Sequence, residues 1–170
     1  MSVATSPVQE ELGGAVPSTA YTTKIIKAGA LVGDTKTLFA SWDPDLTVHE
    51  NLERVRIRNL LGKTSRSRVE DVLAIFRQRY LTDRSVADAL AILVQAGAQA
   101  STLDRLFYFH ATRADALLHD VVADFLAPRY GRGDLDIPLD ATESFIAQRV
   151  SDGQGAAWSE PTTRRVAQGV

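Results

Sequence analysis

After the first twenty residues, apolar side chains recur along this chain at the spacing of amphipathic helices. The clearest stripe consists of Val69, Val72, Leu73, Phe76 and Tyr80, which fall at offsets of 0, 3, 4, 7 and 11. That spacing places all five side chains on one face of a helix. No segment shows the period of two that a half-buried strand produces. The pattern therefore predicts an all-α fold.

Start and stop residues divide this pattern into a compact bundle of about six to eight helices. Capping boxes, in which a hydroxyl and a glutamate satisfy each other's backbone donors, are expected at Thr47–Glu50 and Ser67–Glu70. Gly62 and Pro128 are expected to end the helices that precede them. The expected helices cover about residues 22–40, 47–61, 67–80, 85–97, 101–110, 112–127, 140–150 and 159–170.

Composition suggests three regions along the chain. Residues 1–20 contain proline, glycine and small polar residues, which predict a flexible tail. Residues 21–130 carry most of the helical pattern and are interpreted as one helical domain. Residues 131–170 form a C-terminal helical segment whose last helix reaches Val170 without a clear stop signal, so this segment is expected to be truncated.

The sequence favours a cytoplasmic location. The chain has no cysteine, which excludes a disulfide framework, a thiolate metal site and a cysteine nucleophile. Its first twenty residues contain two glutamates and no basic residue, unlike a targeting signal. The longest uncharged stretch, residues 89–103, is shorter than the roughly 20 apolar residues that a membrane-spanning helix needs.

Charge is distributed unevenly, although the formal net charge is only −2. Residues 21–80 carry eleven Lys/Arg against seven Asp/Glu, whereas residues 81–160 carry six against twelve. Between Val55 and Val69 there is no acidic residue. Guanidinium groups, hydroxyls and the free amides of a helix N-terminus together suit a phosphate. The candidate phosphate-binding residues are Arg54, Arg58, Lys63, Thr64, Ser65, Arg66, Ser67 and Arg68.

A structural interpretation of the same basic run stays open. Arginine stems often cover the edge of an apolar stripe while the charged head remains in water. The arginines could equally pair with the acidic second half of the chain. The sequence alone therefore leaves two alternatives, a nucleic-acid surface and a solvated or internally paired basic face.

A second group of polar residues is a candidate for a metal-dependent nuclease site. Asp115, His119, Asp120 and Asp124 lie close together in a helical region. Their spacing matches no established ligand pattern, and Asp120 and Asp124 are expected on one polar helix face. We expect no metal, no cofactor and no catalytic residue in this chain.

Several short motifs of the chain resemble the BrxA family, a component of bacterial BREX phage-resistance systems. The resemblance covers about residues 21–170, and its basic segment is the most specific part. The motifs are Tyr21-Thr22-Thr23-Lys24, Gly29-Ala30-Leu31, Trp42-Asp43, Asn51-Leu52, the segment from Lys63 to Val72, and Phe76-Arg77-Gln78-Arg79-Tyr80.

The resemblance implies a helical protein that binds DNA and has no enzymatic activity of its own. It implies an N-terminal part similar to the antitermination factor NusB and a C-terminal part similar to a winged helix. Only the beginning of the latter, about Trp158 to Val170, would be present. The leading hypothesis is thus an accessory protein that contacts the phosphates of double-stranded DNA with little sequence preference. The alternative is a protein–protein adaptor of the defence complex, without a membrane association in either case.

Overall fold

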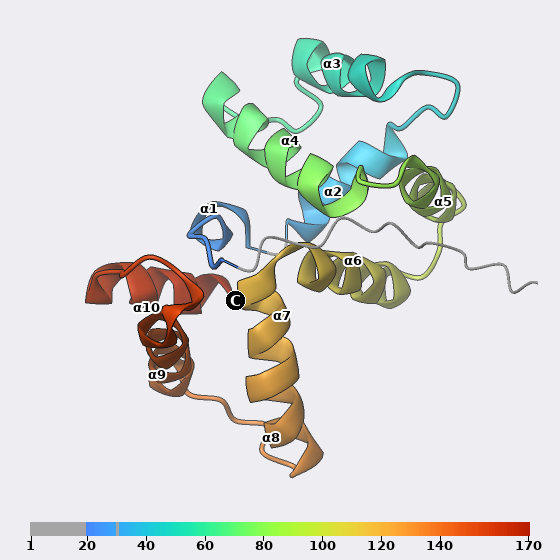
Figure 1. Cartoon of the computed structure of the whole chain (residues 1–170). Helices are drawn as coiled ribbons and strands as arrows, with labels where there is room; N and C mark the ends of the chain where they lie inside the picture. Colours follow the sequence, from blue (N-terminus) through green and yellow to red (C-terminus); the bar gives the residue numbers. More distant parts are fainter. Residues whose placement is uncertain (1–19, 30) are drawn as a thin grey trace, which may run out of the picture.

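The computed structural model describes residues 20–29 and 31–170, and this part of the chain folds into helices without a regular strand. Tyr21 and Gly155 form an isolated bridge between two extended segments. Figure 1 shows the helices packed against one another as a bundle. The all-α bundle expected from the sequence is therefore confirmed. The tail expected over residues 1–20 lies, apart from its final residue, outside the described residues.

A first group of helices surrounds a cluster of aromatic side chains. These helices are α2 (Val32–Ala40), α3 (Val48–Arg58), α4 (Arg66–Tyr80), α5 (Arg84–Gln95) and α6 (Ala100–Ala114). The ring centroid of Phe39 lies 5.0 Å from that of Phe76 and 5.7 Å from that of Phe107. The Tyr80 hydroxyl donates a hydrogen bond to the Phe107 carbonyl at 3.3 Å. Aromatic pairs of this kind contribute roughly 0.5–1.5 kcal/mol beyond the burial of their area.

A second group of helices surrounds an aliphatic cluster. Its members are α1 (Ile25–Ala28), α7 (Ala116–Asp120), α9 (Leu139–Arg149), α10 (Glu160–Gly169) and two π-helical segments, η1 (Val121–Leu126) and η2 (Val150–Gln154). Helix α8 (Ala127–Gly131) follows η1 and has no buried residue. Ile25, Leu117, Val121, Ile146 and Val166 are all fully buried in this cluster. Residues from the two ends of the described chain thus share one core.

Helix α6 connects the two clusters. Phe107 belongs to the aromatic cluster, and Ala111, one turn later, belongs to the aliphatic one. Helix α1 adds a second connection, since it contacts both α4 and α10. The domain boundary near residue 130 stays a prediction.

The single helix expected over residues 22–40 is wrong. The helix stops after Ala28 and resumes at Val32 because Gly29 and Leu31 have positive φ angles of 43° and 45°. A left-handed residue cannot continue a right-handed helix. The break lets α1 turn onto α4, where the Arg79 guanidinium donates a hydrogen bond to the Gly29 carbonyl at 3.1 Å.

One of the two expected capping boxes is confirmed. The Thr47 hydroxyl accepts from the Glu50 amide at 3.2 Å, and the Glu50 carboxylate accepts from the Thr47 amide at 2.8 Å. The box expected at residues 67–70 is wrong. Helix α4 begins earlier, because Ser65 already has the extended conformation of an N-cap and its hydroxyl accepts from the Arg68 amide at 3.2 Å.

Two expected stop signals are also wrong. Helix α3 ends at Arg58, since Asn59 adopts a left-handed conformation with φ 44°, three residues before Gly62. Pro128 does not end the helical path, which continues from η1 into α8. Proline lacks an amide hydrogen to donate within this continuous path, and the six residues directly before α8 are π-helical rather than α-helical.

The helices of the described residues are too short or too polar for a bilayer. Helices α4 and α6 have 15 residues each, and both contain several charged side chains. A bilayer core requires about 20 mostly apolar residues. Within the part of the chain that the structure describes, no helix could cross a membrane.

The break between α1 and α2 can be tested with a pair of glycine substitutions. Gly29→Ala should lower the free energy of unfolding by about 1–2 kcal/mol, because a Cβ is unfavourable in the left-handed region. Gly33→Ala, in the first turn of α2 where a Cβ meets no atom within 4 Å, should raise it by about 0.5 kcal/mol. Urea denaturation measures both. Equal stability of the two variants would contradict the requirement for glycine at position 29.

Candidate functional site

The basic run is built from the end of α3, the start of α4 and the turn between them, residues 59–65. Asn59 fixes the shape of this turn. Its side-chain amide donates to the Lys63 carbonyl at 3.1 Å, and its side-chain oxygen accepts from the Lys63 amide at 3.2 Å. Asparagine tolerates the left-handed conformation that the turn requires. The sequence pattern did not mark Asn59, because its role depends on a backbone conformation that only the structure shows.

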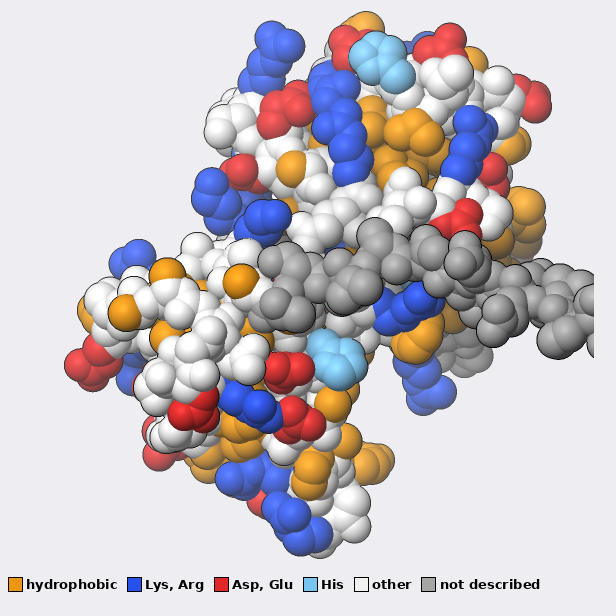
Figure 2. Space-filling view, in the orientation of Figure 1, with side chains coloured by type: hydrophobic (Ala, Val, Ile, Leu, Met, Phe, Trp, Pro, Cys, Tyr) orange, Lys and Arg blue, Asp and Glu red, His pale blue; other side chains and the backbone are white. Residues whose placement is uncertain are grey.

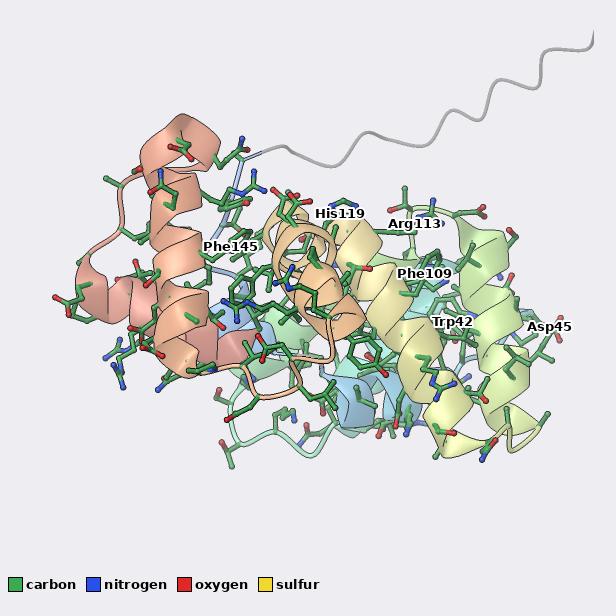
Figure 3. All side chains as sticks on the ribbon, turned by 90° about the horizontal axis from the view of Figure 1, so that it is seen from below. Trp42, Asp45, Phe109, Arg113, His119 and Phe145 are labelled. Carbon is green, nitrogen blue, oxygen red and sulfur yellow. The ribbon has the colours of Figure 1, made fainter. Side chains whose placement is uncertain are left out.

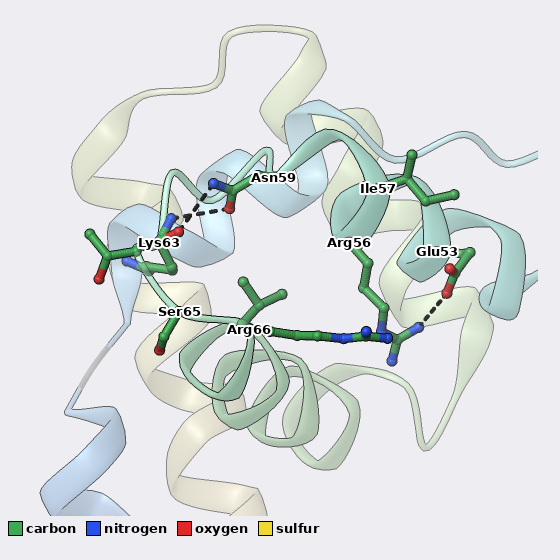
Figure 4. A pocket seen from close by; sticks show the side chains of 9 residues that line it. Glu53, Arg56, Ile57, Asn59, Lys63, Ser65 and Arg66 are labelled. Atoms are coloured by element: carbon green, nitrogen blue, oxygen red, sulfur yellow. Dashed lines mark hydrogen bonds and ion pairs between the residues drawn. The ribbon is translucent and has the colours of Figure 1, made fainter.

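A pocket of about 360 Å³ lies between α3, the turn and α4 (Figure 4). It combines cationic, polar and apolar side chains. Four of the candidate residues face it, Lys63, Thr64, Ser65 and Arg66. The full lining is Glu53, Arg56, Ile57, Asn59, Lys63, Thr64, Ser65, Arg66 and Val69. Arg54, Arg58, Ser67 and Arg68 are not part of this lining.

Two of the candidate cations have partners within the protein. The Arg54 guanidinium lies 3.3 Å from the Asp43 carboxylate and donates to the Ser41 carbonyl at 2.8 Å. The Lys63 ammonium lies 2.7 Å from the Asp34 carboxylate of α2, and both side chains of that pair are half-buried. These contacts fasten α3 and the turn to the segment that follows α2 and to α2 itself.

The other three candidate cations face solvent without such partners. Arg66 and Arg58 are exposed, and Arg68 is half-buried. Among the described residues, none of these three guanidinium groups has a hydrogen bond or an ion pair. Thr64 and Ser67 are exposed beside them. The structure thus separates the candidates into cations held by the fold and cations that remain available.

Arg56 connects α3 to α4 across the pocket. Its guanidinium donates two hydrogen bonds to Glu70, at 2.7 and 3.1 Å, and one to Glu53 at 3.1 Å. The hydrogen bonds from Arg56 lower the pKa of the Glu70 carboxyl. A bidentate pair of this kind positions the two helices as well as neutralising charge. The basic run contained Arg56, but nothing in the sequence identified Glu70 as its partner.

Ile57 is an apolar side chain among the basic residues around the α3–α4 turn. It is 76% exposed and forms one wall of the pocket. Figure 4 shows Ile57 and Arg56 on α3, with the Arg66 side chain extended along the pocket from the start of α4. The pocket is therefore amphipathic, a property that the count of basic residues did not indicate.

Charges of both signs alternate on the surface around the site. Figure 2 shows lysine and arginine side chains interleaved with aspartate and glutamate on the face seen in Figure 1. A surface of this kind concentrates anions less than a continuous basic patch does. Individual unpaired cations, rather than the net charge of the region, therefore determine what it can bind.

The four residues of the candidate nuclease site are engaged in contacts within the fold. Asp120 accepts a hydrogen bond from the Tyr21 hydroxyl at 2.7 Å and lies 3.2 Å from His119. Asp115 caps α7 through the Leu118 amide at 3.1 Å. Figure 3 shows His119 on the surface of the α7 region. Asp124 pairs with Arg149.

No group of three potential metal ligands occurs in the described part of the chain. The side chains at positions 115 and 124 are held by different helices and serve different contacts. The donor set that a metal-dependent nuclease would need is thus not gathered at this place.

Comparison with known proteins adds a family assignment. The BrxA family model matches residues 19–170. Neither the curated proteins nor the solved structures yield a match. The expected similarities to NusB and to a winged helix consequently stay predictions.

A double-mutant cycle on Arg56 and Glu70 tests the connection between α3 and α4. The coupling free energy should be below about 1 kcal/mol near neutral pH, because the pair is partly exposed. Since the folded pKa of Glu70 is lowered, this stabilisation is present above the ordinary glutamate pKa of about 4.3 and disappears as the pH falls through the lowered value.

Urea denaturation of the wild type, both single variants and the double variant measures this coupling. Arg56→Ala and Glu70→Ala should be coupled near pH 7 and uncoupled at strongly acidic pH. Arg58→Ala with Glu70→Ala is the control, because no hydrogen bond or ion pair joins these two side chains and Arg58 is not among the charges that lower the pKa of Glu70. Equal coupling in both cycles would contradict the assigned contact.

Proposed function

This chain belongs to the BrxA family, and from that membership we propose that it serves a bacterial BREX phage-resistance system as a DNA-binding accessory protein. BrxA proteins are components of these systems. The observation that carries the DNA-binding role is the group of available cations Arg58, Arg66 and Arg68 around the α3–α4 turn. One guanidinium group can donate hydrogen bonds to two phosphate oxygens at once, which makes arginine a favourable phosphate ligand.

Neutral groups of the turn complete the proposed contact. Thr64 and Ser67 offer exposed hydroxyls, and the first turn of α4 offers amides that have no partner within the helix. All of these groups would contact phosphates and none would read base edges. The proposed binding is therefore weakly sequence-specific and strongly dependent on salt.

The remaining candidates take structural roles in this proposal. Arg54 and Lys63 hold the turn in place through Asp43 and Asp34. Ser65 caps α4 and so orients its free amides. The polar groups of these three side chains are already bonded within the protein. Replacing the side chains should therefore change the stability of the turn more than the affinity for DNA.

We propose in addition that the protein has no enzymatic activity of its own and acts in the cytoplasm. The acidic residues near His119 support the first point, since each is used to cap or join helices. The absence of cysteine is in keeping with a reducing compartment.

A protein–protein adaptor is the second candidate function, and Ile57 is the observation that favours it. An isoleucine that is 76% exposed beside Arg66 suits a partner segment that carries both apolar and acidic side chains. An adaptor would bind another defence subunit through this pocket and would have no affinity for DNA.

A fluorescence-anisotropy titration of labelled duplex DNA at about 50 and 200 mM salt tests the leading function. Arg66→Ala/Arg68→Ala should weaken binding on all sequences alike. It should also flatten the slope of log affinity against log salt by about 2 units, because two phosphate contacts are lost.

Arg54→Gln provides the matched comparison at the same site. Its guanidinium is bound by Asp43 and the Ser41 carbonyl, so this variant should keep the wild-type salt slope while unfolding at a lower urea concentration. Absence of DNA binding by the wild type at low salt would instead support the adaptor. An unchanged slope in the double variant would remove Arg66 and Arg68 from the DNA surface.

A further inference from the structure

Two lysines, Lys24 just before α1 and Lys27 within it, lie against the outer side of α4. The Lys27 ammonium is 3.4 Å from the Asp71 carboxylate, and the Lys24 ammonium donates to the Gln78 side-chain oxygen at 3.2 Å. Burial of Ile25 between these lysines fixes α1 in this position. The two lysines precede the basic run by about thirty residues in sequence, yet α1 packs against α4, the helix that begins in the basic run (Figure 1).

The outer side of α4 carries cations along both of its edges. Arg66 and Arg77 are eleven residues apart and therefore share the edge toward α3. Arg68 and Asp71 share the opposite edge, toward α1, because they are three residues apart. Between the edges lie the small exposed side chains of Ser67 and Ala74, and Glu70, whose carboxylate is held by Arg56. Small residues there would let a flat or convex partner approach the helix closely.

The lysines keep most of their charge available. Gln78 is neutral, so its hydrogen bond leaves the positive charge of Lys24 uncompensated. The pair of Lys27 with Asp71 is solvent-exposed, with 64% of the lysine side chain and 32% of the aspartate side chain accessible. Exposed ion pairs are weak and exchange readily for a competing anion.

We infer that Lys24 and Lys27 extend the phosphate-binding surface from the start of α4 across α1, an inference that rests on the proposed DNA-binding function. From Arg68 to Gln78 the helix rises by roughly 15 Å, at 1.5 Å per residue. Phosphates of one strand of a duplex follow one another every 3.4 Å along its axis, so a row of this length faces about four of them. Arg68, Lys27 and Lys24 thus form a row of cations that matches a continuous stretch of duplex backbone.

Exposed aromatic side chains lie away from this row. Phe109 and Tyr130 are 54% and 73% exposed, but they belong to α6 and α8 rather than to α1 or α4. Phe109 is paired with the Arg113 guanidinium, 5.6 Å from its ring centroid. Single-stranded nucleic acid is usually held by stacking its bases on aromatic rings. A row of cations with small side chains beside it suits the backbone of a duplex.

The test compares three double variants in the salt-dependent anisotropy titration with duplex DNA. Lys24→Gln/Lys27→Gln should flatten the salt slope by about 2 units, as much as Arg66→Gln/Arg68→Gln does. Arg105→Gln/Arg132→Gln removes the same charge from exposed positions on α6 and after α8, and should leave the slope within about half a unit of the wild type. Circular dichroism checks that all three variants keep the wild-type helix content.

A further variant separates binding from a structural role of Lys27. Asp71→Asn removes the competing carboxylate, so it should tighten duplex binding about two- to fivefold, which corresponds to the strength of an exposed ion pair. A lysine that merely fastened α1 to α4 would leave the same tightening when Lys27→Gln is combined with Asp71→Asn, whereas a lysine that binds phosphate would lose it in the combined variant.

The outcomes distinguish the extended surface from the proposed function. If the two lysine substitutions leave the slope unchanged while Arg66→Gln/Arg68→Gln flattens it, the extension across α1 is wrong and the DNA-binding role stands. If the wild type fails to bind duplex DNA at low salt, both the function and the extension are overturned. Equal flattening by the lysine and arginine variants, with the control unchanged, supports both.

Discussion

The position of α1 is the constraint on which the rest of this structure depends. A helical segment of four residues cannot fold by itself, so burial of Ile25 against other helices must supply its stability. The left-handed Gly29 makes that burial possible, because it releases α1 from the axis of α2. The Arg79 guanidinium then fastens the Gly29 carbonyl from α4. This short helix is therefore a second connection between the aromatic cluster and the aliphatic cluster, in addition to α6.

Internal pairing decides which charges of the site are available to a partner. A count of basic residues treats Arg54 and Arg66 alike, but the former is bound by Asp43 and the latter is not. The paired cations shape the α3–α4 turn, and the unpaired ones give it an outward charge. A few guanidinium groups can therefore act on a phosphate although acidic side chains lie throughout the same surface.

Local patterns in the sequence predicted much of the fold. The stripe that ends at Tyr80 is buried as its spacing indicated, and Thr47 begins α3 with the expected capping box. These features depend on residues within one or two turns of each other. The break at Gly29 was missed because glycine is tolerated within a helix, and only the burial of Ile25 makes the left-handed conformation favourable.

The candidate site was predictable in its position but not in the roles of its members. The pocket lies at the expected α3–α4 turn, yet the Lys63–Asp34 and Arg56–Glu70 pairs join residues far apart in sequence. The periodicity of apolar residues in a sequence does not indicate pairs of this kind. The contact of Lys24 with α4 could not be predicted for a different reason. The sequence pattern predicted a continuous helix over residues 22–40, and such a helix would have placed Lys24 on the axis of α2, away from α4.

The contact between α1 and α10 has a consequence for biosynthesis. Gly169 approaches the Ile25 backbone so closely that a Cβ at this position would lie 3.0 Å from the Ile25 carbonyl oxygen. Helix α10, which forms one side of the cavity that receives Ile25, is thus translated long after Ile25 itself has left the ribosome. Helices α2 to α6 have all their aromatic partners by then, whereas α1 must wait for α10 before its position is complete. The α3–α4 turn is therefore assembled early in translation, and the two lysines that lie against α4 reach their final place late.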